Sequence, residues 1–159
     1  MNHHSYFYFL VVNSLKKDKP KYKQIIDAAI IVIAENGYHQ SQVSKIAKQA
    51  GVADGTIYLY FKNKEDILIS VFEEKMEVFA DNLKEILKED ISASEKLYKM
   101  IENHFKVLAS NKHLATVTQL ELRQSNLALR LRINAILKNY LTLLDIILKE
   151  GTKNVEFES

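Results

Sequence analysis

The 159-residue sequence has no cysteine, one proline and four glycines. The missing cysteines exclude disulfides and thiolate chemistry, and they make a reducing cytoplasm the natural compartment. With so few glycines and a single proline, little in the sequence interrupts a helix, so long helices are favoured. Hydrophobic residues at 47% and charged residues at 26% predict a globular chain with a core of domain size, or a small domain and part of a second.

Long hydrophobic runs are also missing. The apolar run from Tyr6 to Val12 has seven residues, far fewer than the roughly 20 that a membrane-spanning helix needs. It lacks a positive segment before it and a small-residue cleavage site after it, which argues against a signal peptide. We interpret residues 1–15 as an N-terminal extension. One explanation is that translation begins near Leu15 and that residues 1–14 are an artefact of gene prediction.

The net charge of +2 hides an uneven distribution of charge along the chain. Residues 16–64 contain nine lysines and four acidic residues, a local net charge of +5. Residues 65–159 contain thirteen basic and sixteen acidic residues, a net charge of −3. Positive charge is therefore concentrated in the N-terminal part, as binding to nucleic-acid phosphates requires. On charge alone, a surface of solvating lysines is an equal alternative.

Apolar residues recur at helical spacing along the chain, and the sequence shows no strand-like alternation or internal repeat. The fold class is therefore predicted to be all-α. Pro20 stands near the start of the first helix, and Asn36-Gly37 is a strong stop signal after it. A capping box, Ser92 to Glu95, opens a later helix. The helices expected outside the motif described below cover residues 22–35, 64–87, 95–108, 113–123 and 127–148.

The later helices each carry an apolar face, and these faces are expected to pack together as a bundle. His104 lies on such a face and is interpreted as a core residue rather than a catalytic base. The residues predicted to point inward after residue 92 are Leu97, Met100, Ile101, His104, Phe105, Leu108, Leu114, Val117, Leu120, Leu129, Ile133, Ile136, Leu137, Tyr140, Leu144, Ile147 and Leu148.

The segment from Val43 to Leu68 carries the most specific pattern in the chain. Ser44 is placed to cap a short helix, and Gly51 provides the backbone freedom for a sharp turn. Val52 fills the angle after the turn, and Asp54 is expected to cap a second short helix. Two short helices joined in this way form a helix-turn-helix, whose second helix enters the major groove of DNA. The helix over residues 22–35 would complete a three-helix head.

The second helix of the motif presents small, polar and aromatic residues to DNA. Hydroxyl and methyl groups at Thr56 and Tyr58 are placed to meet base edges, and Gly55 lets the backbone approach closely. Tyr60 and Lys64 are placed to contact phosphates. The residues predicted to bind DNA are Ser44, Lys45, Lys48, Gly55, Thr56, Tyr58, Tyr60 and Lys64.

Several of these predictions have a structural alternative. The rings of Tyr58 and Tyr60 could instead be packed in the core, and Lys45 and Lys48 could simply be solvated. Phe61 is predicted to be a core residue that anchors the head to the long helix after it.

These motifs resemble the TetR family of bacterial transcriptional repressors. One departure is Val43, where the family commonly has threonine, and Ser44 is expected to take over its contact. The resemblance extends over residues 20–80 and is carried by Ile46-Ala47, Ala50-Gly51-Val52, Gly55-Thr56-Ile57-Tyr58, Tyr60-Phe61 and Lys64 to Leu68.

The resemblance implies two domains and a homodimer that binds double-stranded operator DNA. Residues 18–64 would form the helix-turn-helix DNA-binding domain, continuing into the long helix as far as residue 80. Residues 65–159 would form a partial helical domain for effector binding and dimerisation.

The sequence His113-Leu-Ala-Thr-Val-Thr-Gln-Leu-Glu-Leu-Arg-Gln-Ser-Asn126 is similar to the members of this family that regulate fatty-acid degradation in bacilli. That likeness implies a repressor that needs no cofactor and that long-chain acyl-CoA releases from its operator. Another hydrophobic or cationic effector is the alternative.

The candidate effector residues fall into two groups. Apolar side chains between helices can line an acyl tunnel, although ordinary core packing is the favoured explanation for any one of them. Arginine suits the phosphates of coenzyme A, although a solvated helix face is the alternative. The candidates are Phe72, Met76, Phe105 and Leu108 for the tunnel, and Arg123, Arg130 and Arg132 for the phosphates.

The sequence does not indicate an enzyme. The five histidines do not form a pair with metal-ligand spacing and carboxylate support. It contains no P-loop, no glycine-rich nucleotide loop and no Ser-His-Asp arrangement. We therefore expect a regulator without a metal or a membrane partner, located in the cytoplasm at the nucleoid.

Regulators of the TetR family usually continue for two more helices, which form the dimer interface and close the ligand pocket. This sequence ends at Ser159, soon after Gly151. The interpretations considered are a truncated or frameshifted gene, a short natural variant, and dimerisation through the apolar helix over residues 127–148. A truncated chain would be non-functional, or an interaction protein that pairs with a full-length relative and blocks its dimer.

Overall fold

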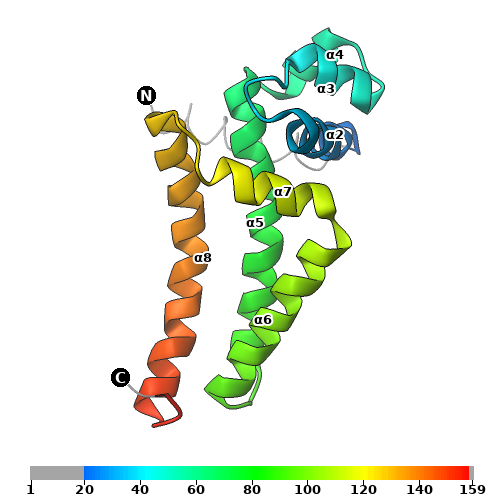
Figure 1. The fold of residues 1–159 in the computed structure, drawn as a ribbon. Coiled ribbons are helices and arrows are strands. Elements are labelled where there is room, and N and C mark those ends of the chain that lie inside the picture. The colour runs from blue at the N-terminus through cyan, green and yellow to red at the C-terminus, as the bar shows by residue number, and fades with distance from the viewer. Residues whose placement is uncertain (1–19, 158–159) are drawn as a thin grey trace, which may run out of the picture. The chain divides into compact units, whose positions relative to one another are not determined.

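The computed structural model describes residues 20–157, and within them it contains helices and no strands, which confirms the all-α prediction (Figure 1). No helix in this range is long and apolar enough to cross a membrane. Residues 1–15, interpreted above as an extension, lie outside the described residues. The helices are α2 (Pro20–Asn36), α3 (Val43–Ala50), α4 (Asp54–Tyr60), α5 (Lys64–Lys88), α6 (Ala93–Ser110), α7 (Lys112–Glu121) and α8 (Leu127–Lys153).

The chain divides into two compact units after Leu68. We call residues 20–68 unit 1 and residues 69–157 unit 2. Helix α5 belongs to both, because its first residues lie in unit 1 and the rest in unit 2. The sequence predicts the domain boundary between residues 64 and 65, at the start of α5.

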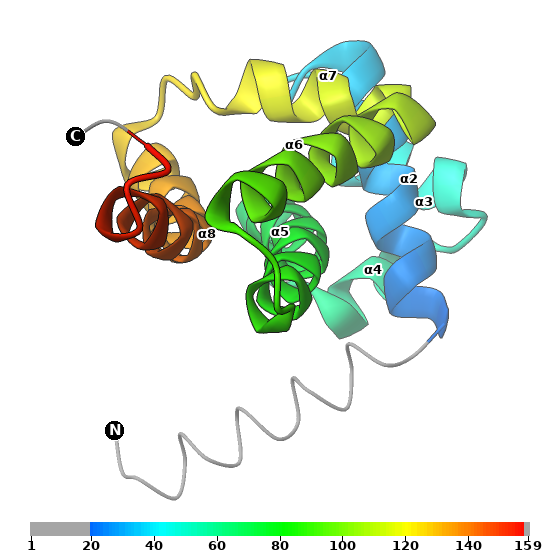
Figure 2. The ribbon, with the colours of Figure 1, turned by 90° about the horizontal axis from the view of Figure 1, so that it is seen from below.

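Helix α2 supplies the central apolar face of unit 1 and packs against α3 (Figure 2). The rings of Tyr22 and Phe61 stack with their centroids 5.1 Å apart. Phe61 is only 2% exposed, which confirms its prediction as a core residue. Burying each large apolar side chain contributes about 1.5–3 kcal/mol. The buried residues of α2 are Tyr22, Ile25, Ile26, Ala28, Ala29, Ile30, Val32 and Ile33.

Glycines end the first two helices of unit 1, as predicted. Gly37 and Gly51 have φ angles of +76° and +70°. After α3, the N–H of Gly51 donates to Lys48 O at 3.2 Å, and the N–H of Val52 donates to Ala47 O at 3.0 Å. These bonds satisfy carbonyls at the end of the helix, and a residue without a Cβ adopts the left-handed conformation at the least cost. The sharp turn of the helix-turn-helix therefore depends on Gly51.

Two of the predicted helix caps are wrong by one or two positions. The N-cap of α3 is Gln42, so Ser44 lies inside the first turn and does not cap it. The N-cap of α4 is Ala53, so Asp54 is the first helical residue. Within the described chain neither N-cap side chain accepts a hydrogen bond from its helix. The carboxylate of Asp54 still lies in the first turn, where negative charge favours the helix dipole.

The caps of unit 2 are better formed. The hydroxyl oxygen of Ser92 accepts a hydrogen bond from the N–H of Glu95 at 3.2 Å, as the capping box predicted. Side-chain oxygens of Asn111 and Asn126 likewise cap α7 and α8, each at 3.0 Å from a backbone nitrogen. Each such cap contributes about 1 kcal/mol to helix stability.

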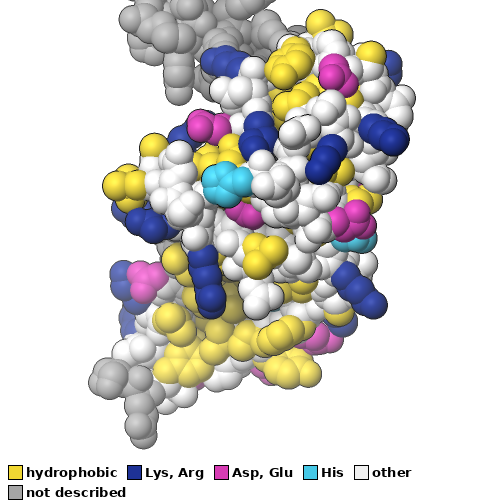
Figure 3. Space-filling view, turned by 45° about the horizontal axis from the view of Figure 1, so that its top comes forward, with side chains coloured by type: hydrophobic (Ala, Val, Ile, Leu, Met, Phe, Trp, Pro, Cys, Tyr) yellow, Lys and Arg dark blue, Asp and Glu magenta, His cyan; other side chains and the backbone are white. Residues whose placement is uncertain are grey.

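The core of unit 2 is a cluster of apolar residues from α5, α6 and α8. Large hydrophobic side chains are also exposed on α6 and α8, and hydrophobic side chains gather on the surface near the C-terminal end of the described chain (Figure 3). The buried members of the cluster are Met76, Phe79, Leu83, Ala93, Tyr140 and Ile147.

Four residues predicted to point inward are exposed instead. Ile101 is 43% exposed, Phe105 67%, Leu120 50% and Leu148 42%. Each stands one position from a residue that lies on the packed face of its helix, and one position rotates a side chain by about 100°. The packed face of α6, for example, runs through Leu97, Met100, Val107 and Leu108.

An ion pair joins α6 to α8 at the far end of unit 2. Lys96 Nζ lies 3.0 Å from both carboxylate oxygens of Glu150. The side chain of Lys96 is 8% exposed and that of Glu150 is 31% exposed. Both charges are therefore largely withdrawn from water, and each requires the other.

The residues after α8 fold back toward the start of α6. The N–H and the hydroxyl of Ser94 both donate to Glu156 Oε2, at 2.8 and 3.1 Å. The Ser94 N–H lowers the pKa of the Glu156 carboxyl below its usual value, because it favours the charged form. A Cβ at Gly151 would lie 1.9 Å from the ring of Phe157, so a larger residue there would force that ring to move.

We expect Lys96→Ala to lower the free energy of unfolding of unit 2 by about 1–3 kcal/mol. The substitution leaves the Glu150 carboxylate partly buried without its cation; partial exposure of Glu150 keeps the loss below that of a fully buried pair. The control is Lys99→Ala, which breaks the more exposed pair with Glu89 and should cost less than about 1 kcal/mol. Urea unfolding measures both, and equal losses would contradict a structural role for the Lys96 pair.

Candidate nucleic-acid interface and effector site

Helix α4 has four exposed residues, namely Asp54 in its first turn and Gly55, Tyr58 and Leu59 after it. Gly55 is exposed, Tyr58 is 56% exposed and Leu59 is 67% exposed. Ile57 points the other way and is fully buried, so it anchors the helix. The side chain of Tyr58 therefore lies outside the core, and the alternative of core packing does not apply to it. Thr56 is half-buried at the edge of this surface.

Tyr60 lies at the boundary between surface and core. It is half-buried, and its ring centroid lies 6.4 Å from that of Tyr22 on α2. The sequence analysis did not include Leu59 among the candidate residues. Its exposure was predictable, because Leu59 does not lie on the side of the helix that carries Ile57 and Phe61. An exposed leucine on such a helix can contact the methyl group of thymine.

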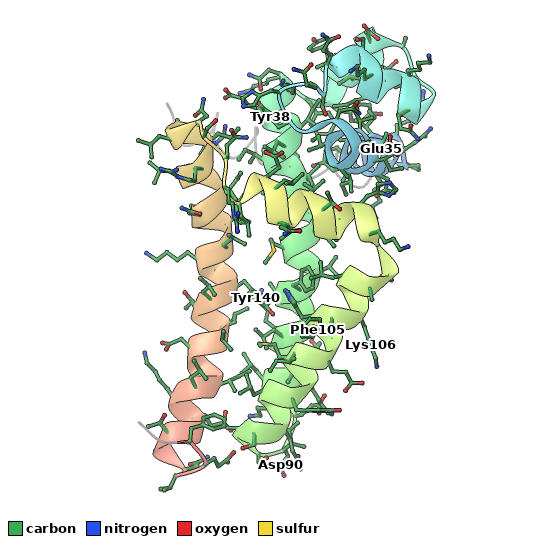
Figure 4. The ribbon with its side chains drawn as sticks, viewed as in Figure 1. Glu35, Tyr38, Asp90, Phe105, Lys106 and Tyr140 are labelled. Atoms are coloured by element: carbon green, nitrogen blue, oxygen red, sulfur yellow. The ribbon has the colours of Figure 1, made fainter. Side chains whose placement is uncertain are left out.

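Lys64 binds within unit 1 rather than extending freely into solvent. Its Nζ donates to Tyr38 O at 3.0 Å and to His39 O at 3.3 Å. The same atom lies 4.4 Å from the centroid of the Tyr38 ring. Tyr38 is labelled in Figure 4. Lys64 thus ties the start of α5 to the connection between α2 and α3. The sequence predicts that Lys64 contacts a DNA phosphate. The ammonium group would then have to bind the phosphate as well as these two carbonyl oxygens.

The start of α5 has a second set of contacts. Asn63 Oδ1 accepts a hydrogen bond from the N–H of Asp66 at 2.8 Å, and Asp66 Oδ2 accepts one from the N–H of Lys62 at 2.9 Å. This reciprocal arrangement satisfies two backbone donors at the helix start. The orientation of the helix immediately after α4 is therefore well defined.

Helix α3 carries the remaining predicted DNA contacts. Ser44, Lys45 and Lys48 are all exposed. Lys45 Nζ donates to Gln40 O at 3.1 Å. The sequences of α3 and α4 contain a single acidic residue, Asp54. The surface that these two helices present is therefore suited to an anionic partner.

The structure brings together only part of the predicted acyl tunnel. Met76 of α5 and Leu108 of α6 belong to the same apolar cluster. Phe72 is buried on α5, one turn before Met76. Phe105 is exposed, so the prediction that it faces inward with the others is wrong.

The three arginines lie around the connection between α7 and α8. Arg123 and Arg132 are exposed and Arg130 is half-buried. The connection itself is held by Gln124, which is 4% exposed. Its Nε2 donates to Glu121 Oε2 at 2.9 Å, and its Oε1 accepts from the N–H of Asn126 at 3.3 Å. The arginines thus project from a turn that buried polar contacts hold in place.

A polar side chain stands among the aromatic residues of unit 2. The ring of His104 on α6 lies 4.8 Å from that of Phe79 on α5 and 6.3 Å from that of Tyr140 on α8. Burial lowers the pKa of His104 and raises that of Tyr140, because it disfavours the charged form of each. Across residues 20–157, no group of histidine, aspartate and glutamate residues could hold a metal ion.

We expect Lys64→Met to lower the free energy of unfolding of unit 1 by about 1–2 kcal/mol, because two backbone carbonyls lose a charged donor. Lys48→Met is the matched control, since Lys48 is exposed and its loss should change stability by less than about 0.5 kcal/mol. Thermal unfolding followed by circular dichroism distinguishes the two variants. Equal stability of both would show that the contacts of Lys64 contribute nothing.

The chain matches two protein families along most of its length. Residues 25–71 match the bacterial regulatory proteins of the tetR family. Residues 72–159 match the family described as the C-terminal region of YsiA-like proteins. It is also 66% identical to the fatty acid metabolism regulator protein of Bacillus subtilis (strain 168) over 144 residues, which are 91% of this chain and 74% of that protein.

Solved structures give the same result. The structure of FadR from Bacillus subtilis in complex with stearoyl-CoA is 67% identical, with a TM-score of 0.82 over 87% of this chain and 74% of that one. The fatty acid degradation regulator FadR from Bacillus halodurans is 61% identical, with a TM-score of 0.81 over 86% and 73%. The chain therefore spans about three quarters of the length of these relatives, and it belongs to the TetR family of bacterial transcriptional regulators.

Proposed function

We propose that this protein is a transcriptional repressor of fatty-acid-degradation genes that leaves its operator when long-chain acyl-CoA binds unit 2. The observation that carries the proposal is the 66% identity to a fatty acid metabolism regulator, over 91% of the chain. The similar fold of FadR in complex with stearoyl-CoA, at 67% sequence identity, supports the class of effector. The protein acts on DNA and carries out no catalysis.

Unit 1 binds the operator through α3 and α4. Tyr58 and Leu59 extend from α4 to base edges in the major groove, and Thr56 adds a hydroxyl and a methyl group. Ser44, Lys45 and Lys48 of α3 contact phosphates or raise the local positive potential. Tyr60 and Lys64 have partners inside unit 1, so they act mainly by fixing the position of α4 and of the start of α5.

Unit 2 binds the effector. Phe72, Met76 and Leu108 offer apolar surface to the acyl chain. Arg123, Arg130 and Arg132 offer guanidinium groups to the phosphates of coenzyme A. The protein works as a homodimer, because a palindromic operator needs two recognition helices about one DNA turn apart. It acts in the cytoplasm, at the nucleoid.

A gel-shift titration tests this function. The probe is the promoter region of a fatty-acid-degradation operon, at low salt, with and without stearoyl-CoA. We expect a shifted complex that stearoyl-CoA dissociates and that free coenzyme A leaves intact. The absence of any shift would contradict DNA binding and favour an inactive chain. Release by a cationic drug, with no release by stearoyl-CoA, would contradict the assigned effector.

We expect Gly55→Ala to weaken operator binding without destabilising the protein. A Cβ at Gly55 meets no protein atom within 4 Å, and alanine in a helix is favoured over glycine by up to about 1 kcal/mol. The new methyl group would lie between α4 and the DNA backbone.

Gly51→Ala is the matched control for this substitution. It also adds a single methyl group, but at a φ of +70°, so it should destabilise unit 1 by about 1 kcal/mol. Thermal unfolding and gel-shift titration of both variants check the prediction. Unchanged DNA affinity of Gly55→Ala would place this glycine outside the interface.

A further inference from the structure

Unit 1 exposes large hydrophobic side chains at one place, on α4. Among residues 20–68, exposed large hydrophobic side chains occur only at Tyr58 and Leu59. A single exposed apolar residue is common on protein surfaces and needs no explanation. Two adjacent ones on a helix of seven residues, in a unit that buries its other large apolar side chains more fully, form a surface suited to an apolar contact.

Leu59 stands on an open side of α4. It follows Gly55 by four residues, so the two residues share one side of the helix. A Cβ at Gly55 would meet no atom within 4 Å, so Leu59 is not packed onto the turn before it. The Cα–Cβ bonds of a helix tilt toward its N-terminus, and the N-terminal part of a recognition helix is the part that contacts base edges. The side chain of Leu59 is therefore directed toward the part of α4 that enters the groove.

Helix α4 lacks the side chains that read guanine and adenine. Arginine and lysine bind guanine, and asparagine and glutamine bind adenine, in the best-defined contacts to base edges. The sequence of α4, Asp-Gly-Thr-Ile-Tyr-Leu-Tyr, contains none of these four residue types. Thymine is the base that presents an apolar group, its C5 methyl, in the major groove. The apolar surface of Leu59 therefore matches thymine.

Positive charge next to α4 favours DNA as the partner of this surface. Helix α3 packs against α4 (Figure 1), and its residues Lys45, Lys48 and Gln49 are exposed. The first helix of a helix-turn-helix crosses the DNA backbone, so the lysines of α3 meet phosphates while α4 meets bases. The exposed leucine thus lies in a local field that attracts an anionic partner.

We propose that Leu59 contacts the C5 methyl group of a thymine in each half of the operator, and that this contact makes α4 select thymine. The contact removes apolar surface of both groups from water, which is its source of affinity. Leu59 is thus a specificity-determining residue, while the lysines of α3 provide affinity for DNA of any sequence. The inference rests on the proposed function, because it takes operator DNA as the partner, and it adds the base that α4 reads.

The test removes the methyl groups of thymine and keeps its hydrogen-bonding groups. The promoter region of a fatty-acid-degradation operon is amplified once with dTTP and once with dUTP. Gel-shift titrations compare the two probes at one salt concentration, because the affinity for DNA depends on salt. We expect the uracil probe to bind at least about fourfold more weakly, the factor that corresponds to about 0.8 kcal/mol for one buried methyl group.

The variant Leu59→Ala shows whether the preference comes from Leu59. The side chain is exposed, so its truncation should leave the fold unchanged, which thermal unfolding checks. We expect this variant to bind both probes with equal affinity. Leu120→Ala is the matched control, because it removes the same atoms from a leucine of unit 2 that is 50% exposed, and it should keep the preference for thymine.

The outcomes separate this inference from the proposed function. Equal binding of the two probes by the unaltered protein would overturn the inference. A preference for thymine that persists in Leu59→Ala would also overturn it, because the preference would then come from the shape of the DNA or from another residue. Neither result would affect operator binding or its control by acyl-CoA. If the unaltered protein shifted neither probe at low salt, the proposed function itself would fail.

Discussion

One uninterrupted helix, α5, contributes buried residues to two hydrophobic cores. Its residues Ile67 and Leu68 are fully buried in unit 1, and Met76, Phe79 and Leu83 belong to the core of unit 2. The 25 residues of α5 include no glycine or proline, so nothing in its sequence interrupts the helix. Asn63, Lys64 and Asp66 fix the start of the helix by hydrogen bonds. Helix α4 is therefore followed directly by a helix whose start is held by hydrogen bonds.

Features set by local chemistry were predictable from the sequence. The turn at Gly51, the cap at Ser92 and the burial of Phe61 each follow from a single residue in its immediate context. The recognition of the family from residues 20–80 belongs to the same class, because it depends on fixed spacings within one short motif.

Features set by the fold as a whole were predicted less well. Helical periodicity defines an apolar stripe but leaves its edges open, so Phe105 was placed on the packed face although it lies one position beyond it. Ser44 was predicted as a cap because a serine preceded the apolar pattern, whereas the helix begins one residue before it. The partners of Lys64 come from the connection between α2 and α3, which no local pattern around residue 64 indicates.

The buried polar groups of unit 2 are of two kinds. Lys96 and Glu150 satisfy each other, as do Glu121 and Gln124, so these groups hold helices and turns in place. His104 is the contrasting case, since the described residues leave its Nδ1 without a partner. Stability explains the first kind of group.

The central claim is that operator DNA and acyl-CoA each weaken the binding of the other. The most direct test is the affinity for stearoyl-CoA, measured with and without saturating operator DNA. Two ligands coupled through one protein change each other's affinity by the same factor. We predict that operator DNA raises the dissociation constant of stearoyl-CoA by the factor by which stearoyl-CoA raises that of the operator. Equal affinity for stearoyl-CoA in the free and the DNA-bound protein would contradict an acyl-CoA-controlled repressor.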